Sequence, residues 1–391
     1  MSFYRLYGDV ISKNLCTDCG ACMLVCPKQV ITLEESELSF EPALTGKCLG
    51  EKCNMCIEIC PGAYVPRTDI ERKILGRTRK NDGLEKTQGV MQKVCIAQWK
   101  GMRVLQTAGS GGVVTGLLVY ALEKGLIDGA VLAGPREGKP WLSQARLATT
   151  PQEVIKMAGS RYDSFPQLIG LAAALDKNLK QVAIVGLPCH IQALRKMELG
   201  GRKYQKWTKR VKYRLGLWCI GNFSRNGIEA MIQNRLGVPL NEVSEVQYRA
   251  RPFPGQFTVT TKTGKIESKE WVSRHLLHRL ASSYMLESCL ECTDAQCDFA
   301  DISFGDPWGH PIDQEALRTG IGFSTALVRT GKGSELIDRA RTDGMFNFFK
   351  ELKGKDRNFL TQTGAVITKC YGHQGFINQR QRHGLPVRVV A

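Results

Sequence analysis

The sequence predicts an α+β, mixed α/β protein in which a small cysteine-rich module precedes a larger domain of alternating helices and strands. Three observations support this architecture. Eight of the 15 cysteines fall in two close runs before residue 61. Beyond about residue 93, apolar helical patterns alternate with short apolar strands. Between these parts, residues 67–92 are charged and hold few apolar positions, as expected of a basic linker.

The first cysteine run has the spacing C-x2-C-x2-C-x3-C-P, and the second has four residues between its first two cysteines. This pattern is typical of a ferredoxin with two [4Fe–4S] clusters, in which the fourth cysteine of each run binds the other cluster. One predicted cluster therefore has the ligands Cys16, Cys19, Cys22 and Cys60. The other has Cys48, Cys53, Cys56 and Cys26. A disulfide framework is disfavoured, because close thiolate runs without a secretory signal indicate metal sites.

Length and composition fit an ordinary globular protein. The 391 residues are 43% hydrophobic and 23% charged, enough for a small module and one large or two medium domains. We find no apolar run of about twenty residues and no basic flank followed by an apolar core at the start. We therefore expect a cytoplasmic protein, one that reaches the inner membrane face only through a partner.

A formal net charge of +17 points to an anionic partner or substrate. Two stretches, 67–80 and 195–214, hold much of the excess. In the second, Tyr204, Trp207 and Tyr213 alternate with basic residues, which superficially resembles a nucleic-acid surface. Because no nucleic-acid-binding motif accompanies it, we interpret this stretch as a solvated loop or a protein-docking face and expect no nucleic acid.

The larger domain is expected over 93–345, after a ferredoxin module in 1–66, and a basic C-terminal extension follows in 346–391. Its predicted helices are 113–124, 166–176, 188–196 and 272–287, with one more in a strand–helix pair over 324–341. Its predicted strands are 127–134, 181–186, 214–219 and 300–306, with a hairpin that turns at Thr263-Gly264.

A second group of cysteines lies in this domain. Cys189 and Cys219 each follow a predicted strand, where binding sites gather in α/β sheets. With the C-x2-C pair Cys289 and Cys292 they could hold a third [4Fe–4S] cluster. Cys297 is an alternative ligand for that cluster. Lone Cys95 and Cys370 are interpreted as small buried hydrophobic residues.

Two glycine-containing turns could approach a phosphate. Ser110-Gly111-Gly112 opens a helix, and a helix N-terminus presents free N–H groups to an anion. The turn 186–190, after a strand, offers a second such place. A Rossmann site for NAD is not indicated, because the sequence lacks G-x-G-x-x-G followed by an acidic residue about twenty positions later.

Six segments resemble, in order and over about 93–310, the family formed by the beta subunits of coenzyme F420-reducing hydrogenase and dehydrogenase. They are SGGVVTGLLVYALEKGLIDGAV, AGSRY, VAIVGLPCHIQALRK, LGLWCIGNF, YRARPFPGQF and CLECTDAQCDFADISFGDPWG. With its ferredoxin module in front, the chain most resembles the input subunits of F420H2 dehydrogenase. The resemblance implies a bound FAD, a [4Fe–4S] cluster beside it, and hydride exchange with a two-electron carrier.

The resemblance also implies roles for individual residues. The FAD phosphates would contact Ser110, Gly111, Gly112 and Thr115, and the flavin site would include Ser160, Arg161 and Tyr162. Residues near the flavin or the incoming substrate would be Asn222, Arg249 and Arg251. The cluster beside the flavin would be held by Cys189, Cys219, Cys289 and Cys292. For His190 we expect a supporting hydrogen bond rather than an acid role.

The implied reaction takes a hydride from reduced coenzyme F420 to FAD and passes single electrons through the clusters to a partner protein. Clustered Lys and Arg residues would attract the phosphate and glutamates of the coenzyme tail. Two alternatives remain open. A ferredoxin-dependent reductase of a porphyrin-type ring would use the same cofactors in reverse. A non-catalytic protein would relay electrons within a larger redox complex.

Overall fold

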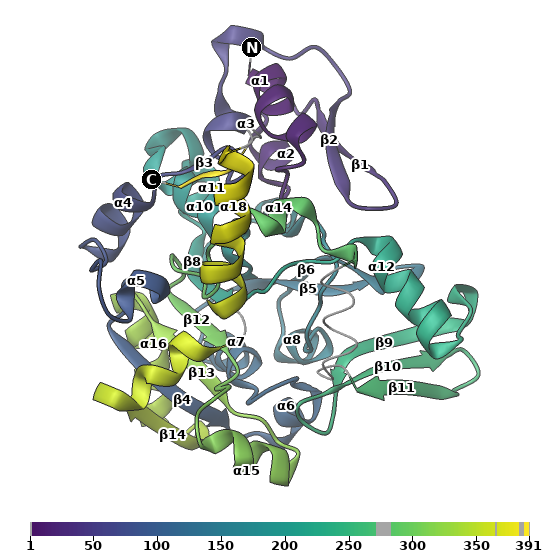
Figure 1. Ribbon diagram of the computed structural model, residues 1–391, viewed down its shortest axis with the longest axis vertical. Coiled ribbons are helices and arrows are strands. Elements are labelled where there is room, and N and C mark those ends of the chain that lie inside the picture. Colours follow the sequence, from purple (N-terminus) through teal and green to yellow (C-terminus); the bar gives the residue numbers. More distant parts are fainter. Residues whose placement is uncertain (1, 271–282, 364–365, 383–386, 391) are drawn as a thin grey trace.

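The computed structural model describes residues 2–270, 283–363, 366–382 and 387–390. A small N-terminal unit stands at one end of a larger body, which is built around an eight-stranded sheet (Figure 1). A separate three-stranded sheet lies at the side of the body. The mixed α/β architecture with an N-terminal module is therefore confirmed. Within the described ranges, none of the helices is both long and apolar enough to cross a membrane.

The N-terminal unit packs its helices against a hairpin. Its elements are α1 (Ser2–Asp9), α2 (Ala21–Val25), β1 (Ile31–Glu35), β2 (Phe40–Leu44) and α3 (Met55–Glu58). The two strands pair antiparallel, with Ile31 opposite Leu44. Leu6 and Val10 of the N-terminal segment join Ile31 in an apolar cluster that includes three of the cysteines. The helices thereby hold both cysteine runs against one small core.

The large sheet has the order β14-β4-β13-β12-β8-β7-β5-β6. Its strands are β4 (Lys93–Trp99), β5 (Gly129–Arg136), β6 (Lys139–Ala148), β7 (Val182–Gly186), β8 (Val211–Leu217), β12 (Ile302–Gly305), β13 (Ser324–Val328) and β14 (Phe346–Leu352). The four central strands β12, β8, β7 and β5 are parallel to their neighbours within this group. Their carboxyl ends therefore meet at one edge of the sheet, where α/β proteins place their ligands.

Helices cover both faces of this sheet, and its central strands are mostly buried. One face packs with α7 (Val113–Glu123) and α16 (Gly331–Thr342). The opposite face packs with α9 (Gly170–Asp176) and α10 (Pro188–Leu199). The other helices are α4 (Arg67–Ile70), α5 (Glu85–Gln88), α6 (Met102–Thr107), α8 (Pro151–Lys156), α11 (Gln205–Thr208), α12 (Arg225–Ala230), α14 (Glu287–Leu290), α15 (Ile312–Thr319) and α18 (His373–Arg382).

The smaller sheet contains β9 (Val243–Ala250), β10 (Gln256–Thr261) and β11 (Ile266–Glu270). The last two strands form the expected hairpin, and Tyr248 and Phe257 lie in its apolar core with Ile228 of α12. The helix predicted over 272–287 falls largely on residues outside the described ranges. A final short strand, β15 (Val389–Val390), pairs in parallel with β3 (Tyr64–Val65) at the end of the ferredoxin module.

Residues 67–92 are not a free linker. They form α4, a π-helical turn (Glu71–Leu75) and α5, and Ile70 and Gln88 are buried. The Arg79 guanidinium lies 2.7 Å from Asp298 of the body and also pairs with Glu71. Arg79 therefore connects this stretch to the body instead of leaving it as a spacer between two domains.

The large sheet also extends past residue 345, the predicted end of the larger domain. Strand β14 pairs antiparallel with β4, so residues 346–352 complete the sheet edge rather than begin an extension. Strands β4, β6 and β14 were not predicted. Each lies at or near a sheet edge. Polar residues weaken the apolar patterns of β6 and β14, whereas β4 contains the apolar run VCIA at the point where the charged stretch ends.

The basic stretch 195–214 is also less exposed than expected. Its three aromatic residues, Tyr204, Trp207 and Tyr213, are buried in the core. Arg195 lies 2.7 Å from Glu198 and 2.9 Å from Asp301, and Arg214 pairs with the same two carboxylates. These residues therefore stabilise the body. The exposed cations of this stretch are Arg202, Lys203, Lys206 and Lys209.

Candidate functional site

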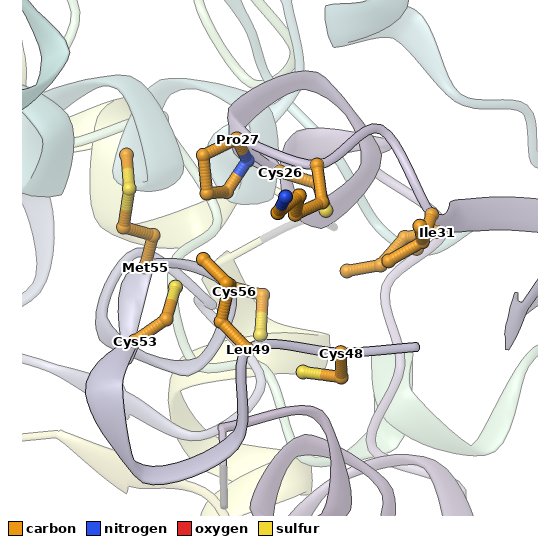
Figure 2. Close-up of a pocket in the computed structure, with 10 residues that line it drawn as sticks. Cys26, Pro27, Ile31, Cys48, Leu49, Cys53, Met55 and Cys56 are labelled. Atoms are coloured by element: carbon orange, nitrogen blue, oxygen red, sulfur yellow. The ribbon is translucent and has the colours of Figure 1, made fainter. Parts of the chain in front are cut away.

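An open cavity lies in the N-terminal unit between the two cysteine runs. Four cysteines surround it in Figure 2: Cys26 from the first run, and Cys48, Cys53 and Cys56 from the second. The lining is otherwise mostly apolar, from Pro27, Val30, Ile31, Leu49 and Met55, with Lys28 as its charged member. The structure thus brings together the crossed set of four that the sequence assigned to one cluster.

The other crossed set is also assembled. Burial, together with the nearby Cys60 thiol, raises the pKa of the Cys19 thiol to about 12. The pKa of Cys22 is likewise raised well above its usual value by burial and by the thiols of Cys19 and Cys60. The pKa of Cys16 is raised by burial, and Cys22 and Cys60 contribute to that rise. Such thiols become ligands only when a metal centre displaces their protons.

A third group of cysteines gathers at the carboxyl edge of the large sheet. Cys189 and Cys219 follow β7 and β8, which pair in parallel with Gly186 opposite Gly216. Cys289 and Cys292 come from the loop at α14, and the backbone N–H of Asn222 donates to Cys289 Sγ at 3.3 Å. Burial raises the pKa of Cys189 well above its usual value, and the thiols of Cys219, Cys289 and Cys292 raise it further.

The remaining cysteines have packing roles in the structure. Cys297 has a left-handed backbone with φ of +54°, and a Cβ added to Gly216 would lie 2.5 Å from its Sγ. Its thiol therefore occupies the space beside β8 that the missing side chain leaves, although it also neighbours Cys189. Cys95 is fully buried in β4, as expected. Cys370 is half-buried and its thiol donates to the carbonyl oxygens of Thr87 and Thr293.

Within the described residues, no three His, Cys, Asp or Glu side chains converge as ligands of a single metal ion would. A [4Fe–4S] cluster places its four thiolates on four different irons, so its ligand set has a wider spacing than that of a single ion.

The first cysteine set lies against the larger body. The Leu168 backbone N–H donates to the Cys19 carbonyl oxygen at 3.0 Å, and Ser164 Oγ donates to Asp18 at 2.7 Å. The Cys19 thiol is also among the groups that raise the pKa of Cys189. The first and third cysteine groups are therefore neighbours across the boundary between ferredoxin and body.

The glycine loop before α7, residues 109–112, has backbone positions that only glycine fits well. A Cβ on Gly111 would lie 2.6 Å from the Ser324 nitrogen and 2.8 Å from the Ala97 oxygen. The loop lies so close to the backbones of β4 and β13 that only glycine fits at position 111. Gly112 precedes the helix with φ of +71°. Ser110 Oγ donates to the Phe323 carbonyl at 2.7 Å, while Thr115 lies half-buried in the first turn of α7.

Gly109 brings two other predicted site residues to this loop, although it was not itself predicted. A Cβ there would lie 3.1 Å from Ser160 Oγ and 3.3 Å from Arg249 Cβ. Ser160 and Arg249 come from distant segments, so their meeting at the loop could not be derived from spacing. The signal that could have identified Gly109 is its position next to the Ser110-Gly111-Gly112 motif.

Arginine side chains provide the charge of this region. Arg249 Nη1 lies 2.9 Å from Asp306, a residue that the sequence analysis did not predict. Burial opposes the positive charge of Arg249, but the neighbouring Asp306 carboxylate outweighs it and raises the pKa of Arg249. Within the described ranges, Arg249 Nη2 and the Nε and Nη1 atoms of Arg161 are buried without a hydrogen-bond partner. Arg251 Nε instead donates to the Leu105 carbonyl oxygen at 2.8 Å. Two of the three predicted arginines thus present unused buried donors.

Tyr162 and Asn222 connect this arginine region to the third cysteine group. The Tyr162 ring stacks on the Phe223 ring, with centroids 6.3 Å apart. The backbone carbonyl oxygen of Tyr162 accepts a hydrogen bond from the Phe223 N–H at 2.8 Å. Tyr162 also contacts Arg249 through a side-chain hydrogen bond. Asn222, the neighbour of Phe223, donates through its backbone to Cys289. Ser160, Arg249, Tyr162 and Asn222 therefore join one continuous set of contacts between Gly109 and Cys289.

His190 has the supporting position expected for it. Its Nδ1 accepts a hydrogen bond from the Leu187 backbone N–H at 3.1 Å, in the turn between β7 and α10. Burial lowers the pKa of His190 to about 3, so the imidazole is neutral and holds the turn that carries Cys189.

Three family models match the chain. A 4Fe-4S dicluster domain matches residues 8–61. The N-terminal and C-terminal models of the coenzyme F420 hydrogenase/dehydrogenase beta subunit match residues 95–171 and 179–352. The ferredoxin module expected from the cysteine runs is thereby confirmed as a domain that carries [4Fe–4S] clusters.

Individual proteins are similar over large parts of the chain. The beta subunit of coenzyme F420 hydrogenase from Methanosarcina barkeri is 32% identical over 244 residues, which are 62% of this chain and 76% of that protein. A component of F(420)H(2) dehydrogenase from Methanosarcina mazei is 26% identical over 346 residues, 86% of this chain and 85% of that one. A chain in a solved structure of the F420-reducing [NiFe] hydrogenase complex of M. barkeri aligns with a TM-score of 0.60 and 27% identity, covering 76% of this chain and 95% of that chain.

Proposed function

The chain belongs to the family formed by the beta subunits of coenzyme F420 hydrogenase and dehydrogenase, and from this membership we propose that it oxidises reduced coenzyme F420 at a bound FAD. The electrons then pass singly through [4Fe–4S] clusters to a partner protein. Two similar proteins are named as components of enzymes that act on this coenzyme, which supports both the substrate and the need for a partner. The family resemblance noted from the sequence is confirmed, whereas the flavin and the third cluster are part of the proposal.

The residues at the glycine loop fit the phosphates of FAD. Arg161 and Arg249 have buried N–H donors without partners in the described part of the chain, and such donors suit an anion rich in acceptors. Because Gly109 has no side chain, Ser160 and Arg249 can pack closely against the loop. The start of α7, which follows Ser110, Gly111 and Gly112 and includes Thr115, adds backbone N–H groups. Ser110 would act through its backbone, since its hydroxyl already donates to Phe323.

Flavin, when bound, accepts a hydride in one step and returns electrons one at a time, which is the chemistry needed between a hydride carrier and clusters. The chain would contribute position and charge. Asp306 holds Arg249 in place, and the stacked pair Tyr162 and Phe223 separates the arginines from the cysteine loop. His190 is neutral and keeps the turn of Cys189 in position, so no side-chain proton transfer is assigned to it.

The continuous contact from the glycine loop to the ferredoxin carries the proposal. It runs from Gly109 through Arg249, Tyr162, Phe223 and Asn222 to Cys289. The third cysteine group then neighbours Cys19 of the first ferredoxin set. The second set lines a cavity whose walls all belong to the ferredoxin. This order supports a route through the third cluster, then the cluster of Cys16, Cys19, Cys22 and Cys60, and finally the cluster at the open cavity.

The test is the anaerobic reaction of cluster-reconstituted protein with reduced coenzyme F420 and a viologen dye, followed by the absorbance of the oxidised coenzyme. We expect the absorbance to grow with FAD-loaded protein and to stay flat with the same protein depleted of FAD. A flat trace from protein with full flavin and iron content would overturn the proposal. The porphyrin-type ring reductase would then be tested with the electron flow reversed.

A second experiment separates an enzyme from a relay protein. The Arg161→Met variant removes unpaired donors of the proposed flavin site, whereas Lys209→Met removes an exposed lysine elsewhere. If the chain is the enzyme, only the first variant should lose coenzyme oxidation, and added FAD should restore part of it. If neither the parent nor the two variants oxidise the coenzyme while flavin and iron contents are full, the non-catalytic relay is favoured.

A further inference from the structure

The C-terminal segment packs onto the loop of the third cysteine group, although it lies beyond residue 352, where the family model ends. This segment comprises a π-helical turn (Ile367–Gly372) and α18. In Figure 1, α18 stands beside α14, the helix that carries Cys289. The chain outside the family match therefore contributes directly to the surroundings of the predicted cluster ligands.

Polar contacts fix the segment to that loop. Arg380 lies 2.6 Å from Glu287 and its Nε lies 2.8 Å from Glu291, so one guanidinium holds both ends of α14. His373 Nδ1 lies 3.1 Å from the Cys292 carbonyl oxygen. These contacts involve carboxylates and backbone, and none of them touches a thiol sulfur.

Lys369 differs from these residues because its ammonium reaches a sulfur. Its Nζ lies 3.3 Å from Cys292 Sγ and 3.3 Å from the Asp294 carbonyl oxygen. The side chain is buried, with 1% of the residue exposed. A buried ammonium is costly unless negative groups surround it, and four thiolates bound to a cluster would be such groups.

We propose that Lys369 raises the reduction potential of the third [4Fe–4S] cluster by placing a buried positive charge and an N–H donor at the Cys292 sulfur. This inference rests on the proposed function, since it requires that cluster to be present. A cluster with four thiolate ligands is negatively charged and becomes more negative when it accepts an electron. A nearby cation therefore stabilises the reduced form more than the oxidised form, and hydrogen bonds to sulfur act in the same direction.

Burial makes this effect larger than that of a surface lysine. Interactions between buried charges are weakly screened by salt, whereas exposed charges are screened within about 10 Å at 0.1 M ionic strength. Asp294 and Arg329 are also close to this region, and their charges have opposite signs. Neither is changed in the variants that test the proposal, so their contribution to the potential is common to all of them.

The experiment is a redox titration of the full-length reconstituted protein, followed by electron paramagnetic resonance and preceded by iron analysis. The signal that disappears in Cys289→Ala identifies the third cluster. Three variants are compared with the parent: Lys369→Met removes the charge, Lys369→Arg keeps it, and Arg380→Met removes another cation of the same segment. The last variant loosens the segment without removing a contact to sulfur.

We expect the equilibrium constant for reduction of the third cluster to fall at least tenfold in Lys369→Met, which is 59 mV for a one-electron couple. Lys369→Arg should stay within threefold of the parent. An unchanged potential in Lys369→Met, with about 12 irons per chain for three clusters, would overturn the inference and leave the proposed function intact. An equal fall in Arg380→Met would also overturn it, because the segment rather than the charge would then set the potential. Only about 8 irons in the parent would refute the third cluster itself.

Discussion

Lys196 of α10 donates a hydrogen bond to the backbone carbonyl oxygen of Cys60 at 2.5 Å. The same ammonium donates to the Tyr64 carbonyl, three residues before the start of α4. Cys60 is the residue predicted to cross from the second cysteine run to the first cluster. A helix of the larger body therefore holds the backbone of a predicted cluster ligand and attaches the ferredoxin to the body.

Replacing this lysine should weaken that attachment. In Lys196→Met, the carbonyls of Cys60 and Tyr64 lose their buried donor, which costs about 1–3 kcal/mol for each unsatisfied group. We expect faster release of the ferredoxin by limited proteolysis and a lower midpoint of thermal unfolding. Lys209→Met, at an exposed lysine of the same stretch, is the matched control. Equal proteolysis of the two variants would contradict this role.

The glycine loop should tolerate no side chain at Gly111, whether or not flavin is bound. Gly111→Ala forces a Cβ against the backbones of β4 and β13, and overpacking of this kind costs about 1–3 kcal/mol. Chemical unfolding of flavin-free protein measures this effect. Gly331→Ala is the control, because a Cβ there meets no atom within 4 Å. Normal stability of Gly111→Ala would show that the loop can move away from the sheet.

The two arginines at the site should respond differently to removal. Arg161→Met loses donors that have no partner in the described residues, so stability should be retained while FAD binds about 10- to 100-fold more weakly. Arg249→Met also leaves Asp306 buried without its partner, which costs about 3–5 kcal/mol of stability. Titration calorimetry with FAD and thermal unfolding separate the two effects. Unaltered FAD affinity in both variants would place the flavin elsewhere.

A buried acid in α15 gives a pH dependence that can be measured. Burial raises the pKa of Asp313 to about 6, and one of its oxygens lacks a partner within the described ranges. Because the unfolded group titrates near about 3.9, the stability that the protonated acid contributes is complete below about pH 4 and is lost as the pH rises to about 6. Above that pH the fold contains an unfavourable buried charge.

Asp313→Asn should remove this dependence, since an amide oxygen can still accept the hydrogen bond from Gly309. Relative to the parent, the variant should gain about 1 kcal/mol between pH 4.5 and 7, after allowance for solvent screening. Unfolding midpoints at the two pH values provide the comparison. Parallel shifts of parent and variant would show that Asp313 titrates in the folded protein as it does in the unfolded chain.

Local spacing explains what the sequence could predict. The cysteine runs identified the ferredoxin because cluster ligands lie within a few residues of one another, and the apolar patterns located α7, β5, β7 and β8 because these elements are buried on the large sheet. Cys189 and Cys219 could be paired because parallel strands end at one sheet edge.

Contacts between segments that are distant in the chain explain what the sequence could not predict. Arg195 and Arg79 look like surface charges in the sequence, yet each binds a carboxylate more than 100 residues away. No local pattern indicates that Gly111 lies between two strands, or that Lys369 reaches Cys292 across 77 residues of chain. In each case the partner of the residue is set by tertiary packing.

The pairing of β15 with β3 has a consequence for the order in which this protein is assembled. Val389 and Val390 lie beside Tyr64 and Val65, so one edge next to the ferredoxin is completed by residues that leave the ribosome long after the cysteine runs. Domains usually fold as they emerge, and pairings between distant residues form slowly. The ferredoxin can therefore acquire its clusters early in synthesis. Its contact with the body is complete only when residues 389–390 have been synthesised and pair with β3.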